Sequence, residues 1–420
     1  MRLLFVCTGF LPYTFSENLC NGKLVYALVK AGYEIDIISK KDEGPQYNKC
    51  GWEYPWIALR PYTHEISYKN GNIVQRLLDI IYSCLVMRIL PVEGIRWMRR
   101  SYQSAVRLHK KKHYDAILTR SPNDISHYVG LRFTRKFNDI KWLANWNDPA
   151  ATIWPEPYTQ YFPNWKRNAL NKYTQKCLKR ATYNSFPSES LMHHFRKFYP
   201  FLNMERTAII PHIGLHDTIF PKNVSYLRDN TFKMCHSGNL SNERNPELLF
   251  KAIKELVNEG ITNIRLDIMG YANDYAEVLI NKYGLNDYVH FIGSFPYMDA
   301  LVKMAEYDTL VLVEAVMPDG IFFPSKFTDY SQLEKPVLAI SPKTGFARSM
   351  LEKYGGGIAT DNSDCESIKR SIVALYSSWQ KQTITKEYSS CLLFKQFAAE
   401  NIVKIFNKLF NTIQKSDGIK

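Results

Sequence analysis

The chain has 420 residues, of which 45% are hydrophobic, 14% aromatic and 22% charged. This composition is typical of a globular protein with two or three domains, and it excludes disordered, collagen-like and low-complexity architectures. The eight cysteines form no C-x-x-C pair, so neither a zinc site nor a disulfide framework is predicted, and we expect reduced thiols.

The net charge of +14 is unevenly distributed along the chain. Residues 1–215 contain 31 Lys and Arg against 16 Asp and Glu, a net charge of +15, whereas residues 216–420 contain 23 against 24, a net charge of −1. This asymmetry predicts an anionic partner for the N-terminal half, such as a membrane surface, a nucleic acid or an acidic substrate. No segment is apolar over the length that a membrane span requires.

The N-terminal half begins with the pattern of a parallel sheet. Leu3–Thr8 is a short apolar run, typical of a strand that is buried on both faces. Because Gly9 and Pro12 follow, we interpret it as a strand rather than a signal peptide, and we expect a cytoplasmic protein. A helix over Asn18–Ala31 and a strand over Glu34–Ile38 complete a β-loop-α-β unit. Further strands are predicted at Tyr114–Thr119, Lys141–Asn145, Ala181–Phe186 and Thr207–Ile210.

The same pattern restarts after a linker near residues 211–231. Strands are predicted at Phe232–Ser237, Ile264–Met269, Val289–Ile292, Thr309–Val313 and Pro336–Ile340, and helices at Pro246–Asn258, Tyr275–Tyr283, Tyr297–Ala305 and Lys326–Gln332. We therefore predict an α/β fold with two Rossmann-like doubly wound domains, over 1–212 and 213–390. An amphipathic helix over Cys391–Phe410 is predicted in the tail, residues 391–420, which we expect to pack back on the first domain. Ligands of such sheets bind beyond the carboxyl ends of the strands, which predicts a site in the cleft between the domains.

The first informative stretch is HSGNLSNERNPELL, residues 236–249. The predicted strand ends at Gly238, a polar loop carries Arg244, and a helix opens at Pro246. Loop amides and a helix N-terminus favour phosphate oxygens, and Arg244 adds a bidentate donor. An ordinary loop with a solvated arginine explains the pattern equally well. The loop is no Walker motif, and no G-x-G-x-x-G follows the first strand, so a dinucleotide cofactor is not expected.

The second informative stretch is EAVMPDGIFFPSKFTDY, residues 314–330. Ser325 is predicted to cap a helix that Lys326 opens. A lysine in the first turn is unfavourable beside the helix dipole, and an anion sharing the site would explain it. Asp329 follows on the same helix face, so a local ion pair between Lys326 and Asp329 on a solvated helix is the alternative.

The order and spacing of these stretches, together with KPVLA after residue 334, resemble the large retaining glycosyltransferase family with the GT-B fold. The family that the sequence resembles is glycosyltransferase group 1, which is similar to family 4, and the resemblance is to its members of the cell-surface polysaccharide type. The resemblance is strongest over 232–345 and implies an acceptor domain followed by a nucleotide-sugar domain. It also implies that Arg244 and Lys326 clamp the donor diphosphate, near Gly238, and that Asp329 receives the ribose hydroxyls.

The sequence departs from the family pattern at two positions. Asp329 stands where the family more often has Glu, and Ile321 stands where its Glu–seven residues–Glu motif would begin. The resemblance then implies that backbone amides around Asp319 and Gly320 hold the donor sugar. The side chains of Asp319 and Glu314 are further candidates for that contact.

The resemblance assigns the remaining site residues more loosely. It places the nucleobase near Gly270 and near Ser294 and Phe295. In the first domain, Gly22 is expected near the diphosphate, because a glycine lets backbone approach a ligand closely. Asp148, in Asn-Asp-Pro after a strand, is expected to touch acceptor or donor, although Asp-Pro also forms plain turns.

The resemblance implies transfer with retention and without a metal. Arg244 and Lys326 would stabilise the charge that grows on the diphosphate as the glycosyl bond breaks, with Asp148 as a third catalytic candidate. No protein nucleophile, metal or cofactor is expected, and a nucleotide-diphosphate sugar is the donor substrate. The alternatives are a nucleotide-sugar epimerase of GT-B fold, or a non-catalytic binding or scaffold protein, the latter because of Ile321.

The acceptor is predicted from an apolar segment beside a basic one. Ile73–Leu90 is apolar, and a basic run containing Trp97 follows: Arg96, Arg99, Arg100, Arg107, Lys110, Lys111 and Lys112. This combination suits an anionic lipid surface and predicts a lipid-linked or oligosaccharide acceptor, with the enzyme peripheral on the inner face of the cell membrane. A buried helix followed by a solvated basic helix explains the same pattern. No binding motif for nucleic acid accompanies the charge, so nucleic acid is not expected.

Overall fold

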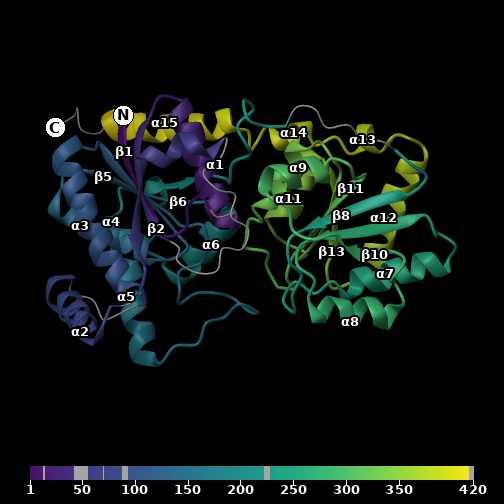
Figure 1. Ribbon diagram of the computed structural model, residues 1–420, viewed down its shortest axis with the longest axis horizontal. Coiled ribbons are helices and arrows are strands. Elements are labelled where there is room, and N and C mark those ends of the chain that lie inside the picture. The colour runs from purple at the N-terminus through teal and green to yellow at the C-terminus, as the bar shows by residue number, and fades with distance from the viewer. Residues whose placement is uncertain (13–14, 42–54, 70, 88–92, 222–227, 416–420) are drawn as a thin grey trace. The chain divides into compact units, whose positions relative to one another are not determined.

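The computed structural model describes residues 1–12, 15–41, 55–69, 71–87, 93–221 and 228–415, and Figure 1 shows the elements they form. The chain divides into two compact units. The first comprises Met1–Pro155, Thr159–Pro211 and Ile402–Lys420, and the second Glu156–Tyr158 and His212–Asn401. Each unit is built on its own parallel sheet, so the predicted α/β fold with two Rossmann-like domains is confirmed.

The first unit contains a seven-stranded sheet in the order β3-β2-β1-β4-β5-β6-β7. Its strands are β1 (Arg2–Cys7), β2 (Glu34–Lys41), β3 (Thr63–Ser67), β4 (Ala116–Arg120), β5 (Lys141–Asn145), β6 (Tyr183–Phe186) and β7 (Thr207–Ile209). Val6 of β1 pairs in parallel with Ile38 of β2 on one side and with Thr119 of β4 on the other. The direction of winding therefore reverses between β1 and β4, and a sheet of this kind binds ligands beyond the strand ends at that point.

Helices cover this sheet, and β1 is buried from Leu3 to Cys7 as its apolar sequence predicts. The helices of the unit are α1 (Ser16–Lys30), α2 (Ile73–Tyr82), α3 (Ile95–Lys112), α4 (Ile125–Lys136), α5 (Asn164–Arg180) and α6 (Glu189–Phe198), with shorter turns at η1 (Trp56–Tyr62), η2 (Ser83–Met87) and η3 (Met204–Arg206). The predicted apolar helix over Ile73–Leu90 is α2 continued by the π-helical turn η2, and residues 88–90 lie outside the described residues. No helix among the described residues is long and apolar enough to span a membrane.

The second unit contains a six-stranded sheet in the order β10-β9-β8-β11-β12-β13. Its strands are β8 (Phe232–Ser237), β9 (Ile264–Met269), β10 (Val289–Phe291), β11 (Thr309–Val313), β12 (Val337–Ser341) and β13 (Gly357–Asp361). Its helices are α7 (Glu247–Asn258), α8 (Asp274–Tyr283), α9 (Tyr297–Met304), α10 (Lys326–Gln332), α11 (Phe346–Tyr354), α12 (Cys365–Gln380), α13 (Ile384–Glu387) and α14 (Cys391–Phe394). Here the winding reverses between β8 and β11, which makes the carboxyl ends of these strands the favoured ligand position.

The C-terminal tail differs from the predicted single helix over Cys391–Phe410. It forms α14 and then α15 (Ala399–Lys415). The helix is interrupted at Phe397, whose ring is buried 5.3 Å from that of Phe323 and whose carbonyl oxygen accepts a hydrogen bond from the Gly214 amide. From Ile402 onward the tail belongs to the first unit, where the Tyr33 hydroxyl donates to Asn407 Oδ1 at 2.5 Å.

Candidate functional site

The carboxyl end of β8 and the first residue of α10 come into contact in the second unit. Gly238 has a φ of +126°, and a Cβ atom there would lie 2.4 Å from Nζ of Lys326. That Nζ donates a hydrogen bond to the Ser237 carbonyl oxygen. A Cβ at Gly270, which follows β9, would lie 2.7 Å from the Gly238 carbonyl oxygen. Two glycines therefore allow two strand ends and a lysine to meet where a side chain would not fit.

Lys326 carries its amine in surroundings that disfavour the charge. Burial, and then the positive charge of Arg244, lower the pKa of Lys326 to about 7. The alternative of a solvated helix is wrong, because residues 327–332 of α10 are all buried. Asp329 is among them, and its Oδ1 accepts a hydrogen bond from the Tyr297 hydroxyl at 2.8 Å. The prediction that Ser325 caps the helix is also wrong, since Ser325 is itself in helical conformation and its side chain accepts no capping bond.

Arg244 lies in the loop between β8 and α7, in a turn that its own amide closes by donating to Ser241 Oγ at 3.2 Å. Its Nε is buried and has no hydrogen-bond acceptor among the described residues. The guanidinium also forms a hydrogen bond with the side chain of Tyr158. Burial raises the pKa of Tyr158, and Arg244 opposes this shift. An unpaired buried N–H costs free energy, which an anionic ligand would recover through a charge-assisted hydrogen bond.

His236, one residue before the end of β8, adds a neutral imidazole to this site. Its Nδ1 lies 3.0 Å from the Val311 carbonyl oxygen. Because a carbonyl only accepts, Nδ1 carries the hydrogen and Nε2 is left as a lone-pair acceptor. Nε2 is buried without a hydrogen-bond partner among the described residues. Burial and the charge of Lys326 hold the pKa of His236 well below its usual range, so the ring is neutral.

Glu314, directly after β11, is a carboxyl group of the same sheet edge. Burial raises its pKa to about 8, and the charge of Arg348 opposes this shift. The carboxyl therefore holds its proton near neutral pH, and it does not offset the charges of Lys326 and Arg244.

The other predicted donor residues also follow strand ends of the second sheet. Asp319 and Gly320 lie after β11, where Asp319 Oδ1 accepts from the Thr344 hydroxyl at 2.7 Å and Gly320 bridges to Gly345. Ser294 and Phe295 lie after β10, exposed and half-buried respectively. Because parallel strands end at one edge, these loops share the edge that holds Lys326, and the roles of these residues stay predictions.

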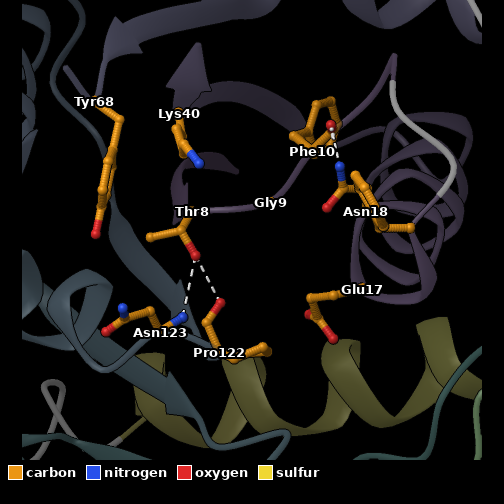
Figure 2. A pocket seen from close by; sticks show the side chains of 10 residues that line it. Thr8, Gly9, Phe10, Glu17, Asn18, Lys40, Tyr68, Pro122 and Asn123 are labelled. Carbon is orange, nitrogen blue, oxygen red and sulfur yellow. Dashed lines mark hydrogen bonds between the residues drawn. The ribbon is translucent and has the colours of Figure 1, made fainter. Parts of the chain in front are cut away.

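The first unit has a pocket of about 450 Å³ at the winding reversal of its sheet (Figure 2). The loops after β1 and β4 meet there, where the Thr8 hydroxyl donates to the Pro122 carbonyl oxygen at 2.7 Å and accepts from the Asn123 amide at 3.1 Å. The lining residues are Thr8, Gly9, Phe10, Phe15, Glu17, Asn18, Lys40, Tyr68, Pro122 and Asn123. Aromatic surface beside amide, hydroxyl and charged groups suits a polar ligand that has apolar faces, such as a sugar.

Lys40 and Glu17 line the pocket on different sides (Figure 2). Nζ of Lys40 lies 4.6 Å from the centre of the Tyr68 ring. Glu17 Oε1 accepts from Asn147 Nδ2 at 2.7 Å and lies 3.1 Å from Nε of Arg120. Burial raises the pKa of Glu17 to about 8 in spite of Arg120, so the carboxyl is largely protonated at neutral pH.

Asp148 stands beside the same arginine. Burial raises its pKa to about 6, and the charge of Arg120 opposes the shift. The pKa of Asp124 is also about 6, raised by burial first and by the charge of Asp148 in addition. The structure thus groups the predicted Asp148 with Glu17, which sequence reasoning missed, since an isolated glutamate early in a helix carries no distinguishing pattern.

Two other predictions for the first domain concern residues that are buried in the structure. Gly22 is buried inside α1, and a Cβ there would lie 2.7 Å from Leu11 Cδ1, so helix packing accounts for the glycine, and its donor role stays a prediction. Trp97 is completely buried and Arg96 is 8% exposed, so the expectation that they contribute to a membrane-facing basic cluster is wrong. Of the same run, Lys112 Nζ pairs with Asp36 Oδ2 at 2.7 Å, whereas Arg100, Arg107, Lys110 and Lys111 are exposed.

Residues 218–390, which include Gly238, Arg244 and Lys326, match the family model described as glycosyl transferases group 1. The match supports a glycosyltransferase. An uncharacterized glycosyltransferase of Methanocaldococcus jannaschii is 25% identical over 186 residues, which are 44% of this chain and 46% of that protein. The chain thus aligns with about half the length of this relative.

Solved structures share the fold over almost the whole chain. Sucrose-phosphate synthase from Thermosynechococcus elongatus gives a TM-score of 0.71 at 14% identity, covering 99% of this chain and 100% of that one. Anabaena HepE, solved with UDP and glucose, gives 0.67 at 16% identity, covering 99% of both chains. A Listeria monocytogenes protein assigned as a UDP-N-acetylglucosamine 2-epimerase gives 0.59 at 12% identity, over 98% and 97%. At these identities the likeness shows the fold alone, which is GT-B.

Proposed function

We propose that the protein is a glycosyltransferase that moves a sugar from a nucleotide-diphosphate sugar to a saccharide or lipid-linked acceptor. The observation that carries the proposal is the pairing of Lys326 with Arg244 at the carboxyl end of β8. The charge of Arg244 lowers the pKa of Lys326, and Arg244 Nε is buried without an acceptor among the described residues. A diphosphate would supply negative charge to both side chains at once.

The family match over 218–390 supports a donor site in the second unit. The UDP that is bound in the Anabaena structure supports a nucleoside diphosphate as the ligand of this fold, and it makes the uridine series the first to test. We propose that Lys326 and Arg244 bind the diphosphate and that Asp329 binds the ribose hydroxyls. The backbone at Gly238 and Gly270, which carries no side chain, would let the diphosphate come close.

The proposed reaction breaks the bond between the anomeric carbon and the diphosphate oxygen, and forms a bond from that carbon to an acceptor hydroxyl oxygen. The bonding pair leaves on the diphosphate, where Lys326 and Arg244 stabilise the growing charge. The acceptor attacks the face that the diphosphate leaves, so the anomeric configuration is retained. The departing diphosphate takes the acceptor's proton, and no protein nucleophile takes part.

We assign the acceptor to the pocket of the first unit. Phe10, Phe15 and Tyr68 offer apolar surface to the faces of a sugar ring, and the polar wall offers donors and acceptors to its hydroxyls. Glu17, whose carboxyl pKa is raised to about 8, adds a group able to donate a hydrogen bond near neutral pH, and the carboxyl of Asp148, with a pKa of about 6, adds an acceptor. An acceptor of cell-surface polysaccharide assembly, free or lipid-linked at the cytoplasmic face of the membrane, fits this setting.

The test is release of nucleoside diphosphate from a panel of nucleotide sugars, with and without saccharide and lipid-linked acceptors. The wild type should release diphosphate only when an acceptor is present, and the product should keep the anomeric configuration of the donor. Lys326→Ala should slow this release roughly 10²–10³-fold, while Lys343→Ala, at a lysine of the same unit that is 78% exposed, should leave it unchanged.

The two alternatives give different results in the same assay. A nucleotide-sugar epimerase would convert the nucleotide sugar to an isomer without any acceptor. The Listeria structure supports this alternative less than the transferase structures support the proposal, since its TM-score is lower. A scaffold protein would bind no nucleotide, and its properties would not change with Lys326→Ala.

A further inference from the structure

Helix α2 packs with polar residues inward and apolar residues outward. Asp79 is 3% exposed and Ser83, just beyond the helix, is completely buried. Six aliphatic side chains of α2 and η2 are instead more than half exposed: Ile73, Val74, Leu77, Leu78, Ile81 and Leu85. A surface helix that faces water has the opposite arrangement, because apolar surface in water costs free energy. This pattern indicates that the aliphatic face of α2 contacts something other than water.

The inward face of α2 is fixed by polar contacts with α3. Oδ1 of Asp79 lies 3.1 Å from Nε of Arg99, and the Arg99 guanidinium lies 5.5 Å from the centre of the Tyr82 ring. At the start of the helix, Asn72 accepts a capping hydrogen bond from the Gln75 amide at 3.0 Å. A buried ion pair selects an orientation more than it adds stability. The helix is therefore held with its aliphatic side chains pointing away from the unit.

The exposed side chains form a continuous stripe. Ile73, Leu77, Ile81 and Leu85 follow each other at four-residue spacing, and side chains at this spacing lie on one helix face. Fifteen residues from 73 to 87 extend about 22 Å at the rise of a helix, which is long enough for a contact surface and too short to cross a bilayer. In Figure 1, α2 lies at the periphery of the first unit, beyond α3 and away from the sheet.

The charge around this stripe identifies the partner. Arg76 on α2 and Arg100 on α3, next to the residue that holds α2, are both exposed. Residues 1–215 carry a net charge of +15. A second copy of the chain would bring like charges together, whereas an anionic lipid surface complements them and accepts aliphatic side chains below its headgroups.

We propose that α2 lies in the interface of an anionic lipid bilayer, with its aliphatic stripe in the acyl boundary and Arg76 and Arg100 at the headgroups. The surface lies outside the donor site and the pocket, so the proposal does not depend on the transferase reaction. It keeps the apolar segment of the predicted membrane contact, which is α2 with η2, and removes the buried Trp97 and Arg96 from that contact.

The experiment is co-sedimentation of the full chain with phosphatidylcholine vesicles, with and without phosphatidylglycerol. The wild type should sediment with the anionic vesicles and much less with the neutral ones. Leu77→Glu/Ile81→Glu should weaken partition about tenfold or more, because two half-exposed aliphatic chains are lost and two repelled charges are gained. Val278→Glu, at an equally apolar position on α8 that is 63% exposed, should partition like the wild type.

Two further variants keep the outcome decisive. Leu77→Ser/Ile81→Ser removes apolar surface without adding charge, and should also weaken binding if the thermal midpoint is unchanged. Arg100→Gln should weaken binding to anionic vesicles alone. The proposal is overturned if the wild type fails to sediment, if the double variants bind as it does, or if neutral vesicles bind equally well. It is also overturned if the wild type is a dimer that the double variants dissociate, without any vesicle binding.

Discussion

Nζ of Lys326 lies 2.4 Å from the point where any residue other than glycine would place its Cβ at position 238. The two residues are 88 positions apart in the sequence, and the meeting of β8 with α10 brings them together. A backbone carbonyl holds the lysine amine in place, so the amine is positioned before any ligand arrives. Preorganised charge of this kind is what stabilises an anionic leaving group without a cost of reorganisation.

Gly238→Ala should therefore abolish donor binding. The methyl group displaces the Lys326 amine, and the φ of +126° adds backbone strain of roughly 1–3 kcal/mol in unfolding free energy. Gly260→Ala is the matched control, because Gly260 has a φ of +98° and nothing within 4 Å of the added Cβ. Both variants should lose thermal stability, but only Gly238→Ala should lose nucleotide binding in a calorimetric titration. Normal binding by Gly238→Ala would contradict the assigned contact.

Lys326→Ala and Arg244→Ala should each lower kcat by roughly 10²–10³-fold, the usual effect of removing one charge-stabilising donor. Neither should unfold the protein, since burial of the lysine amine already disfavours its charged form. Steady-state kinetics with circular dichroism as a folding check measure both effects. Turnover within threefold of the wild type in both variants would rule out the diphosphate clamp.

Donor affinity should fall as the pH rises above about 7. The free protein lowers the pKa of Lys326 to about 7 from 10.5, so the amine is mostly neutral at pH 8.5, whereas a bound diphosphate keeps it charged. Binding then takes up a proton, and the affinity should decrease up to tenfold per pH unit. Titrations with a nucleotide sugar at several pH values, in buffers of different ionisation enthalpy, measure the uptake. Lys326→Arg should show no such dependence, because its side chain stays charged.

The same shift affects the stability of the free protein. The folded-state pKa of Lys326 is lowered, so the folded protein binds fewer protons than the unfolded chain between about pH 7 and 10.5. The destabilisation by the charged amine is fully present below pH 7 and is relieved as the pH rises toward 10.5. Lys326→Met should be more stable than the wild type at pH 7, with the difference shrinking at higher pH in denaturant titrations.

Glu17 should make the stability of the free protein fall as the pH rises, which is the opposite of the effect of Lys326. Its folded-state pKa is raised to about 8 from 4.5, so the stability linked to its bound proton is fully present below pH 4.5 and is lost as the pH rises through 8. Glu17→Gln keeps a neutral group there at every pH. The variant should gain stability relative to the wild type by up to about 1.4 kcal/mol per pH unit between these values. Denaturant titrations at several pH values test this, and parallel stability curves would contradict the raised pKa.

The strands that are buried on both faces could be predicted from the sequence because they are short uninterrupted apolar runs. Lys326–Gln332 was predicted with the bounds that α10 has, since Pro324 precedes it and a helical pattern follows. β3 and β13 were missed. β3 reads THEIS and is only partly buried at the sheet edge, and β13 follows two glycines with positive φ, so neither carries an apolar signal.

The candidate site was predicted only where local motifs mark it. Arg244 and Lys326 stand in recognisable loops, but Tyr158 reaches Arg244 from a segment 86 positions earlier, which no local pattern reveals. His236 lies within the motif of residues 236–249, yet its neutral state depends on burial and on the charge of Lys326, which the motif does not reveal. The basic run after Ile95 predicts an exposed surface, but Trp97 and Arg96 of that run are buried. The helical period alone does not show which face of a helix packs against the protein.

The most direct test of the central claim is a thermal-shift titration of the wild type, Lys326→Ala and Lys343→Ala with nucleoside diphosphates and nucleotide sugars. A ligand that binds the native state raises its melting temperature by mass action. One nucleotide series should raise the melting temperature of the wild type and of Lys343→Ala, but not that of Lys326→Ala. An equal rise in all three proteins would contradict the role of Lys326, and no rise with any nucleotide would contradict the donor site itself.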